Sequence, residues 1–227
     1  MKNLPLLIGT VVGTIVLIVV VAFAFSGTGQ EATQVSVPEN ELIADLRNVK
    51  GATESAQVTI VEFSDFQCPA CRAAQAMVEQ VMERHGATTR LIYRHFPLDQ
   101  IHLNARSAAY AAEAAGTFDK FWPMHDLLFE QQEEWATVTD KEVLYEQFAS
   151  YAQQLQIDKA AFLERIEDSS LQAAVSNDSV YGEKIGISAT PTFFVNGQQV
   201  PVPQLLDAVE SLLNQTASPA ASPAAQK

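Results

Sequence analysis

The sequence predicts an α/β fold in which a central mixed β-sheet is flanked by helices, carries an all-helical insert and is preceded by one transmembrane helix. Three observations predict it. Two β-branched runs separated by a helical stretch form a βαβ unit at residues 58–96, so these two strands are parallel with a right-handed crossover. Helical periodicity then dominates residues 103–186. A strand, a two-residue turn, a second strand and a helix follow at residues 192–213.

An uncharged apolar segment, Leu4–Phe25, lies near the N-terminus. As a helix it would span about 33 Å, enough to cross a hydrocarbon core of roughly 30 Å. Lys2 precedes the segment and acidic residues follow it, so the positive-inside rule places the remaining chain outside the cytoplasm. Residues 1–25 are therefore predicted to anchor the chain in the cell membrane as a single-pass helix, with the domain on the periplasmic or extracellular side.

A cleaved signal peptide is the alternative to this anchor. Ala22-Phe23-Ala24 resembles an A-x-A cleavage site, although the apolar stretch is longer than the usual apolar region of a signal peptide. Both interpretations place the domain on the same side of the membrane.

The remaining chain divides into a tether, one domain and a tail. Residues 26–50 are predicted to form a polar tether, in which Asn40–Leu46 could add a short helix. Residues 51–215 are long enough for one domain, with the helical insertion at about 103–186. Residues 216–227 are rich in Ala, Ser and Pro, cannot bury a core, and are predicted to be disordered.

The βαβ unit begins with Val58–Phe63, which is predicted to be a strand because β-branched residues dominate it. Apolar residues at helical spacing indicate the helix that follows, namely Ala74, Met77, Val78, Val81 and Met82. Arg90–Phe96 is predicted to be the second strand, and Pro97 ends it.

Boundary signals divide the helical insert. Its apolar stripe comprises Phe118, Phe121, Trp122, His125, Leu128 and Phe129. Thr139 and Glu142 are predicted to form a capping box. Asp158 is a suitable N-cap and Gly186 a suitable residue just after the last helix.

The final part of the chain is predicted to form a hairpin and a helix. Thr192–Val195 and Gln198–Val202 are the predicted strands, and Asn196-Gly197 between them is predicted to be a two-residue hairpin turn. The last helix is predicted from about Pro203 to Leu213.

The composition excludes several classes of protein. A net charge of −13 argues against nucleic-acid binding. The chain has only two cysteines, Cys68 and Cys71, which form one C-x-x-C motif. That count excludes a multi-disulfide scaffold, and it excludes a zinc site built of cysteines alone, which needs about four ligands.

A C-x-x-C motif has three physical uses. A disulfide that closes so short a loop removes little unfolded-state entropy, on the order of 2 kcal/mol, so it would be a weak staple. A metal site would need histidines, and the four present lack the paired spacing of zinc modules: His85, His95, His102 and His125. Thiol–disulfide exchange needs only the two sulfurs and is the favoured interpretation. We expect His95 to form a structural hydrogen bond and His125 to be packed in the insert core.

The position of the motif also favours exchange. Cys68 stands where a strand ends and a helix begins, and Pro69 suits the first helical position. The helix dipole and the unpaired N–H groups at that end stabilise a thiolate and lower the pKa of Cys68. Cys71 lies one turn into the helix and is predicted to be the less exposed, resolving thiol.

Four segments resemble the DsbA-like thiol–disulfide oxidoreductases, and the membrane-anchored BdbD-like branch is the nearest likeness. The segments are Val61–Cys71, Tyr93–Leu98, Phe121–Asp126 and Ala189–Gly197, in the order of the family. The resemblance extends from Val58 to Leu213. It implies a thioredoxin fold with an inserted helical domain, and it implies the oxidation of thiols in exported proteins.

The resemblance also implies roles for three further residues. Glu62, six residues before Cys68, would lie beneath the sulfurs and could exchange a proton with Cys71; a strand-end acid facing water is the alternative. Pro191 matches the family's cis-proline, and the backbone of Thr190 would then pair with an extended substrate. One departure is the Pro69-Ala70 dipeptide, which lacks the histidine that strong oxidants often have, so the helix terminus must contribute more to the thiolate.

The predicted function is an extracytoplasmic oxidase that passes the Cys68–Cys71 disulfide to exported proteins with free thiols. The resemblance implies recycling by a membrane redox partner of the DsbB or VKOR kind, and the chemistry requires no bound cofactor and no metal. One alternative is a reductase or isomerase of the same fold, for example in cytochrome c maturation. Another is a chaperone-like peptide-binding module that is not an enzyme.

Overall fold

The computed structural model describes residues 35–217. The predicted anchor and the first part of the predicted tether lie outside the described residues, and so does most of the predicted tail. Within residues 35–217, no helix combines the length and the apolar character needed to cross a bilayer.

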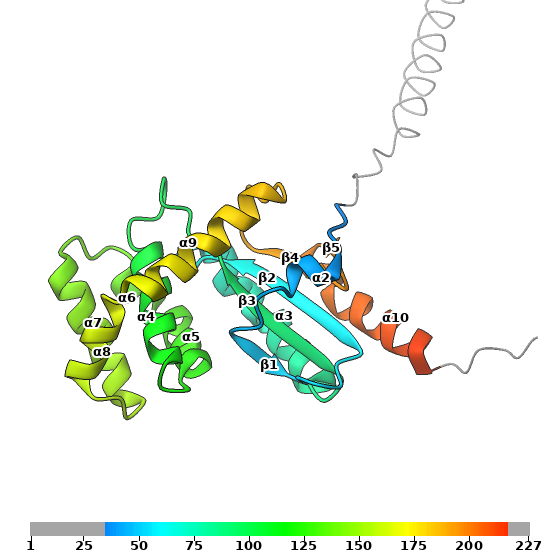
Figure 1. Ribbon diagram of the computed structural model, residues 1–227, viewed down its shortest axis with the longest axis horizontal. Coiled ribbons are helices and arrows are strands. Elements are labelled where there is room, and N and C mark those ends of the chain that lie inside the picture. Colours follow the sequence, from blue (N-terminus) through cyan, green and yellow to red (C-terminus); the bar gives the residue numbers. More distant parts are fainter. Residues whose placement is uncertain (1–34, 218–227) are drawn as a thin grey trace, which may run out of the picture. The chain divides into compact units, whose positions relative to one another are not determined.

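A five-stranded mixed sheet forms the centre of the fold, with strand order β1-β3-β2-β4-β5 (Figure 1). The strands are β1 (Val49–Gly51), β2 (Val58–Ser64), β3 (Thr89–His95), β4 (Thr192–Val195) and β5 (Gln198–Val200). Strand β2 runs parallel to β3 and antiparallel to β4, and β4 pairs antiparallel with β5. The predicted βαβ unit and hairpin are thus both present, joined edge to edge in one sheet.

Helices cover both faces of the sheet and fill the connection between β3 and β4. They are α2 (Glu39–Leu42), α3 (Pro69–His85), α4 (Ala105–Gly116), α5 (Phe121–Glu130), α6 (Gln132–Trp135), α7 (Lys141–Gln154), α8 (Lys159–Ile166), α9 (Ser169–Lys184), α10 (Leu205–Ala217) and the 3₁₀ turn η1 (Val202–Gln204). Every element between β3 and β4 is helical, as the sequence predicts.

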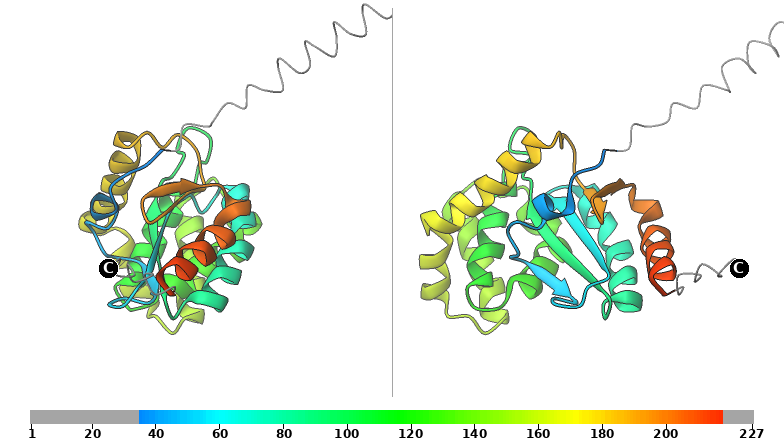
Figure 2. Two further views of the ribbon diagram at one scale, coloured as in Figure 1. Left: turned by 90° about the vertical axis from the view of Figure 1, so that its right-hand side faces the viewer. Right: turned by 45° about the vertical axis from the view of Figure 1, so that its right-hand side comes forward.

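The two faces of the sheet bury different cores. Helices α3 and α10 lie together over one face (Figure 2), where Val58 and Ile60 of β2 pack against Val78 of α3 and Val209 of α10. The second face buries Phe63 with Leu42 of α2 and other apolar residues. Because successive residues of a strand point to opposite faces, Glu62 lies on the α3 face with Val58 and Ile60.

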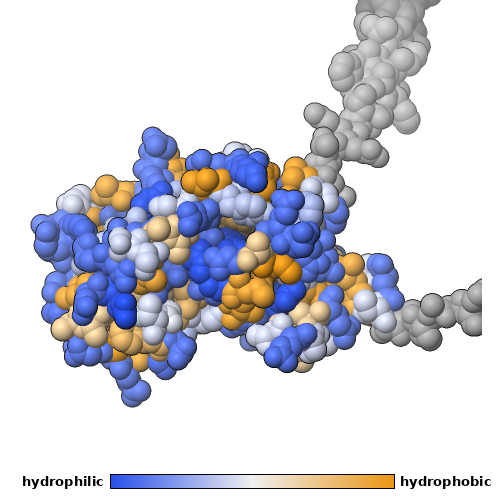
Figure 3. Space-filling model, viewed as in Figure 1, coloured by the Kyte–Doolittle hydropathy of each residue, from blue (hydrophilic) through white to orange (hydrophobic). Residues whose placement is uncertain are grey.

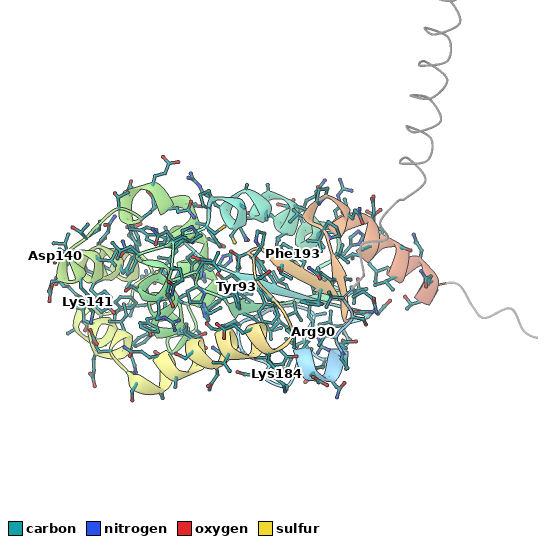
Figure 4. All side chains as sticks on the ribbon, turned by 90° about the horizontal axis from the view of Figure 1, so that it is seen from above. Arg90, Tyr93, Asp140, Lys141, Lys184 and Phe193 are labelled. Atoms are coloured by element: carbon teal, nitrogen blue, oxygen red, sulfur yellow. The ribbon has the colours of Figure 1, made fainter. Side chains whose placement is uncertain are left out.

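The helical insert has its own core, which reaches the sheet. Trp135, Phe148 and Phe162 are fully buried there, and the same cluster includes Tyr93 of β3. Figure 4 labels Tyr93 where the sheet meets the insert. The outer face in Figure 3 is mostly hydrophilic, with apolar residues in small groups, as expected of a surface.

The predicted tether, residues 26–50, is wrong from residue 35 onward. Val37 is 6% exposed and Leu42 fully buried, because both pack on the second face of the sheet. Strand β1 pairs antiparallel with β3, and the short predicted helix is present as α2. At the other end, α10 extends to Ala217, two residues into the predicted tail.

Local signals place most boundaries correctly, with one correction. Asp158 caps α8, and Gly186 follows α9 with φ of 86°. Asn196 and Gly197 both have positive φ, as a type I′ turn requires. The N-cap of α7 is Asp140 and not Thr139, because the Asp140 carboxylate accepts the Val143 N–H at 3.0 Å.

Candidate active site

Cys68 caps the N-terminus of α3, directly after β2. Its backbone is extended, with φ of −75° and ψ of 120°, and Pro69 is the first helical residue. Proline suits that position because the N–H it lacks would be unpaired there. The Cys68 side chain is nearly buried, at 8% exposure, and its thiol donates to the Thr190 carbonyl oxygen at 3.5 Å.

The two cysteines are free thiols in very different surroundings. The pKa of Cys68 is lowered to about 5, chiefly by a hydrogen bond from the Cys71 thiol. Burial raises the pKa of Cys71, which is fully buried one turn into α3, and the hydrogen bond to Cys68 raises it further. At neutral pH Cys68 is therefore a thiolate, and Cys71 keeps its proton.

The segment before β4 completes the rim beside Cys68. Strand β4 begins at Thr192, which lies opposite Phe63 near the end of β2, so the preceding residues lie beside the start of α3. The Thr190–Pro191 bond is cis, as predicted. Thr190 and Pro191 are both half-buried, and the Thr190 carbonyl oxygen lies 3.5 Å from Cys68 Sγ.

Glu62 is buried on the α3 face of the sheet, and Gln75 links it to the Cys71 carbonyl. It is fully buried, and burial raises its pKa to about 7, while a hydrogen bond from Gln75 opposes the rise. The Gln75 amide donates to Glu62 Oε1 at 3.0 Å. A carboxyl with this pKa can both give and take a proton near neutral pH.

Several buried polar atoms of Glu62 and of residues near the cysteines have no hydrogen-bond partner in the described structure. They are Glu62 Oε2, Ser64 Oγ, Tyr93 Oη and Thr190 Oγ1. Burial raises the pKa of Tyr93 well above its usual value, and negative charge on Glu62 or Cys71 raises it further, so this phenol stays neutral beside both groups. Sequence reasoning gave Tyr93 no role of its own, although it begins the family-like segment Tyr93–Leu98, and it missed Gln75, which stands in no recognisable motif.

The helical insert supports the active-site turn through amide side chains. Gln132 of α6 is buried and donates to the carbonyl oxygens of Phe66, at 2.7 Å, and of Cys68, at 3.1 Å. Gln67 donates to the Ala136 carbonyl and accepts the backbone N–H of Asn104. Hydrogen bonds to the helical insert therefore hold the turn that contains Cys68 in place.

Asp65 ties the same turn to the loop after β3. Its carboxylate accepts backbone N–H groups of Gln67 and Leu98 and lies 2.7 Å from His102 Nδ1. His95 is buried with Nε2 2.8 Å from Glu113, which matches the structural hydrogen bond expected of it.

His125 is buried among aromatic rings, as expected, with Nδ1 2.8 Å from the Asp126 carboxylate. Burial lowers its pKa. Across residues 35–217, no three His, Cys, Asp or Glu side chains are grouped to hold a metal ion.

The arrangement is suited to thiol–disulfide exchange. The Cys68 sulfur, 8% exposed and with a stabilised thiolate, lies beside the fully buried Cys71 sulfur, and the buried Glu62 carboxyl is linked to the Cys71 turn of α3 through Gln75. Such a site can form a mixed disulfide at Cys68 and return a proton to Cys71.

Known proteins share this arrangement of elements. A family model described as thioredoxin matches residues 49–215. A solved thioredoxin-like oxidoreductase from Silicibacter pomeroyi DSS-3 has 27% sequence identity and a TM-score of 0.63, and the match covers 80% of this chain and 100% of that one. BdbD from Bacillus subtilis, in its oxidised form, has 23% identity and a TM-score of 0.65, with 80% and 98% covered.

Curated relatives match through part of their length only. The Na(+)/H(+) antiporter NhaA 3 of Salinispora tropica is 34% identical over 190 residues, which is 84% of this chain and 27% of that protein. NhaA 1 of Salinispora arenicola is 35% identical over 178 residues, or 78% and 25%. The chain thus spans about a quarter of these relatives, and their names describe the whole proteins.

The family model covers nearly all of the folded domain, and the solved structures share its arrangement of elements. The chain therefore belongs to the thioredoxin family.

Proposed function

We propose that this chain is a DsbA-like thiol–disulfide oxidoreductase and that it works as an oxidase, passing the Cys68–Cys71 disulfide to thiols of exported proteins. The supporting observation is the inequality of the two thiols, because the pKa of Cys68 falls to about 5 while that of Cys71 rises. A stabilised Cys68 thiolate favours the reduced dithiol over the disulfide, and a disulfide whose reduced form is stabilised is a strong oxidant.

The proposed reaction has two exchanges. A substrate thiolate attacks the Cys68 sulfur; the Cys68–Cys71 bond breaks, and Cys71 leaves with the electron pair and takes the proton of Glu62. A second substrate thiolate then attacks the substrate sulfur of the mixed disulfide, and Cys68 leaves as a thiolate. The substrate loses two electrons and the cysteine pair gains them.

We assign substrate alignment to Thr190 and Pro191. Their backbone lies beside Cys68, whose thiol is 3.5 Å from the Thr190 carbonyl oxygen. An extended substrate segment could form main-chain hydrogen bonds at Thr190, as in other cases of strand addition. This would hold the substrate sulfur in line with the disulfide.

The proposed setting is the outer side of the cell membrane. It rests on the apolar segment Leu4–Phe25 and on the positive-inside rule. Each turnover leaves the cysteine pair reduced, so a membrane redox partner of the DsbB or VKOR kind would have to reoxidise it. Full-length chain should stay with the membrane pellet after washing in high salt; release by the wash would contradict the anchor.

A redox titration of the domain against glutathione, followed by alkylation and mass measurement, tests the direction of exchange. We expect a reduction potential above about −200 mV, because DsbA-type oxidants lie there, whereas a value near about −270 mV, as in thioredoxin, would overturn the oxidase proposal in favour of a reductase. Cys68→Ser serves as the control. If that variant still supported disulfide formation in substrates, the cysteines would be a passive staple and a peptide-binding role would replace the enzyme.

A further inference from the structure

Thr190 has two main-chain groups that an extended substrate could use, its carbonyl oxygen and its N–H. The carbonyl oxygen lies 3.5 Å from Cys68 Sγ, so it points toward the reacting sulfur. Thr190 precedes a proline and is therefore held in an extended conformation. In an extended residue the N–H and the C=O point to about the same side, as in the hydrogen-bonded pairs of an antiparallel sheet. We therefore expect the Thr190 N–H on the Cys68 side as well.

The Thr190 N–H has no hydrogen-bond acceptor within residues 35–217. Strand β4 begins two residues later, at Thr192, so Thr190 lies outside the ladder between β2 and β4. A backbone N–H is a strong donor, and one without an acceptor in the protein can bind a group from another chain. This donor is therefore available to a main-chain carbonyl of a substrate.

The hydroxyl of Thr192 fixes the peptide unit that carries this N–H. Thr192 Oγ1 donates to the Ala189 carbonyl oxygen at 2.8 Å. The Ala189 C=O and the Thr190 N–H belong to one planar trans peptide, in which they point in opposite directions. Because the hydroxyl holds the Ala189 oxygen toward Thr192, it turns the Thr190 N–H away from Thr192.

The sheet gives Thr192 a fixed position from which to hold this peptide unit. Thr192 is 9% exposed and is the first residue of β4, where it pairs with Phe63 of β2. Ala189 is exposed and lies outside the strands and helices, so the hydroxyl links a loop residue to the sheet. A hydrogen bond that is largely shielded from water is electrostatically stronger than one in water. The direction of the Thr190 N–H is thus set by a side chain and not by the β2–β4 ladder.

We propose that Thr192 is a positioning residue for the substrate: its hydroxyl holds the Ala189 carbonyl and so directs the Thr190 N–H at the main chain of an extended polypeptide beside Cys68. The inference rests on the proposed alignment of substrate at Thr190. Thr192 acts through Ala189 and Thr190, and it carries no part of the disulfide exchange. Because the contact that it prepares is with main chain, the substrate class is an extended polypeptide, whatever side chains flank its cysteine.

Oxidation of two substrates tests this role. One is an unstructured peptide with two cysteines, and the other is dithiothreitol, which has two thiols but no main chain. In Thr192→Val, which is similar in shape but lacks the hydroxyl, we expect kcat/KM for the peptide to fall about three- to tenfold, the loss of roughly one hydrogen bond. The rate with dithiothreitol should stay unchanged, because that substrate uses only the sulfurs.

Two further variants serve as controls. Thr192→Ser keeps the hydroxyl and should restore the peptide rate, which a change of packing alone would not do. Thr59→Val removes a buried hydroxyl near the start of β2 that accepts from Arg90 Nε at 3.0 Å, and it should leave both rates unchanged. Four outcomes would each overturn the role of Thr192: a full peptide rate in Thr192→Val, equal losses with both substrates, no recovery in Thr192→Ser, or the same selective loss in Thr59→Val.

Amide hydrogen exchange followed by NMR examines the same contact without turnover. In Cys71→Ser, a peptide joined to Cys68 by a mixed disulfide should slow exchange of the Thr190 N–H about tenfold or more, and adding Thr192→Val should remove most of this protection. Protection that survives Thr192→Val would overturn the role of Thr192 and leave the alignment at Thr190 intact. No protection in Cys71→Ser itself would overturn both, while the reduction potential would still decide the proposed oxidase function.

Discussion

Cys68 and Cys71 carry the same thiol three residues apart, and their surroundings move the two pKa values in opposite directions. At Cys68 the largest influence is the hydrogen bond from Cys71, aided by backbone N–H groups at the start of α3. At Cys71 the largest influence on the pKa is burial, which raises it. The low pKa of Cys68 thus depends on its neighbouring thiol more than on the helix end that the sequence points to.

Paired substitutions of Cys71 test this dependence. Cys71→Ser keeps a hydroxyl donor beside Cys68, and Cys71→Ala removes it. We expect the pKa of Cys68 to be about one pH unit or more higher in Cys71→Ala than in Cys71→Ser, because a hydrogen bond to the thiolate stabilises the charged form. Ultraviolet absorbance of the thiolate against pH measures both values; equal values would assign the low pKa to the helix terminus alone.

Glu62 makes the stability of the fold depend on pH. Its pKa is about 7 in the folded chain and 4.5 when unperturbed, so the folded state binds the proton more tightly. The stabilisation from that proton is complete below about pH 4.5 and is lost as the pH rises through about 7.

Glu62→Gln should remove this dependence. With the cysteines joined as a disulfide, so that no thiol titrates, the free energy of unfolding of Glu62→Gln relative to the unmodified chain should rise between about pH 4.5 and 7. The gain should be on the order of 3 kcal/mol, since a shift of one pKa unit corresponds to about 1.4 kcal/mol. Urea denaturation at several pH values in this range measures the difference. If the free energies of unfolding of the two proteins changed with pH in the same way, Glu62 would be exposed to solvent.

Secondary-structure elements were predictable where a local signal decides them. The β-branched run of β2 and the Asn196-Gly197 turn carry that signal in a few consecutive residues. Strand β1 does not, because its three residues are too short to show alternation and it forms only by pairing with β3. Asp140, and not the predicted Thr139, is the N-cap of α7. Both residue types are good N-caps, so the sequence alone does not distinguish them, and the backbone geometry determines which one caps the helix.

The support of the active-site turn is also a property of elements that the sequence does not reveal. Gln132 belongs to α6, in the insert, and donates to carbonyls of the turn before α3. A glutamine in an acidic helical stretch resembles any surface amide. The motif residues Cys68 and Cys71 could be named from sequence, whereas Gln132 and Gln75 gain their roles only through folding.

Gln132→Ala should weaken the fold at this junction. The change leaves the Phe66 carbonyl without its donor in a buried place, which costs about 1–3 kcal/mol of unfolding free energy. Gln131→Ala is the matched control, because Gln131 is half-buried and donates no side-chain hydrogen bond to the turn, and it should alter stability by less than about 0.5 kcal/mol. Urea denaturation measures the free energy of unfolding of both variants. Equal losses of stability would mean that Gln132 does not support the turn.

At the scale of the whole molecule, a buried set of charges joins the N-terminal segment to both the sheet and the insert. Arg47 lies 2.6 Å from Glu113 of α4 and 2.6 Å from Asp178 of α9. Asp178 also binds Arg94 of β3, and Glu113 binds His95. Nearby charges lower the pKa of Glu113 to about 2 against the opposing effect of burial. These partners are 66 or more residues from Arg47 in sequence, so no local pattern could predict them.

This network explains why residues 35–50 belong to the fold and are not a tether. Arg47 is a cation that the buried carboxylates of Glu113 and Asp178 share, and after its removal Glu113 keeps His95 and Asp178 keeps Arg94. Arg47→Met should therefore lower the free energy of unfolding by about 1–3 kcal/mol, because hydrogen bonds to charged groups are lost while each carboxylate retains another partner. Arg165→Met, which breaks the exposed pair with Asp168, should change stability little, because solvent screens that pair.

Urea denaturation measures the free energy of unfolding of both variants, and limited proteolysis of Arg47→Met should show earlier cleavage within residues 35–50. If Arg47→Met and Arg165→Met had the same stability, the segment would be held by its apolar contacts alone, with Val37 and Leu42 as the anchoring residues.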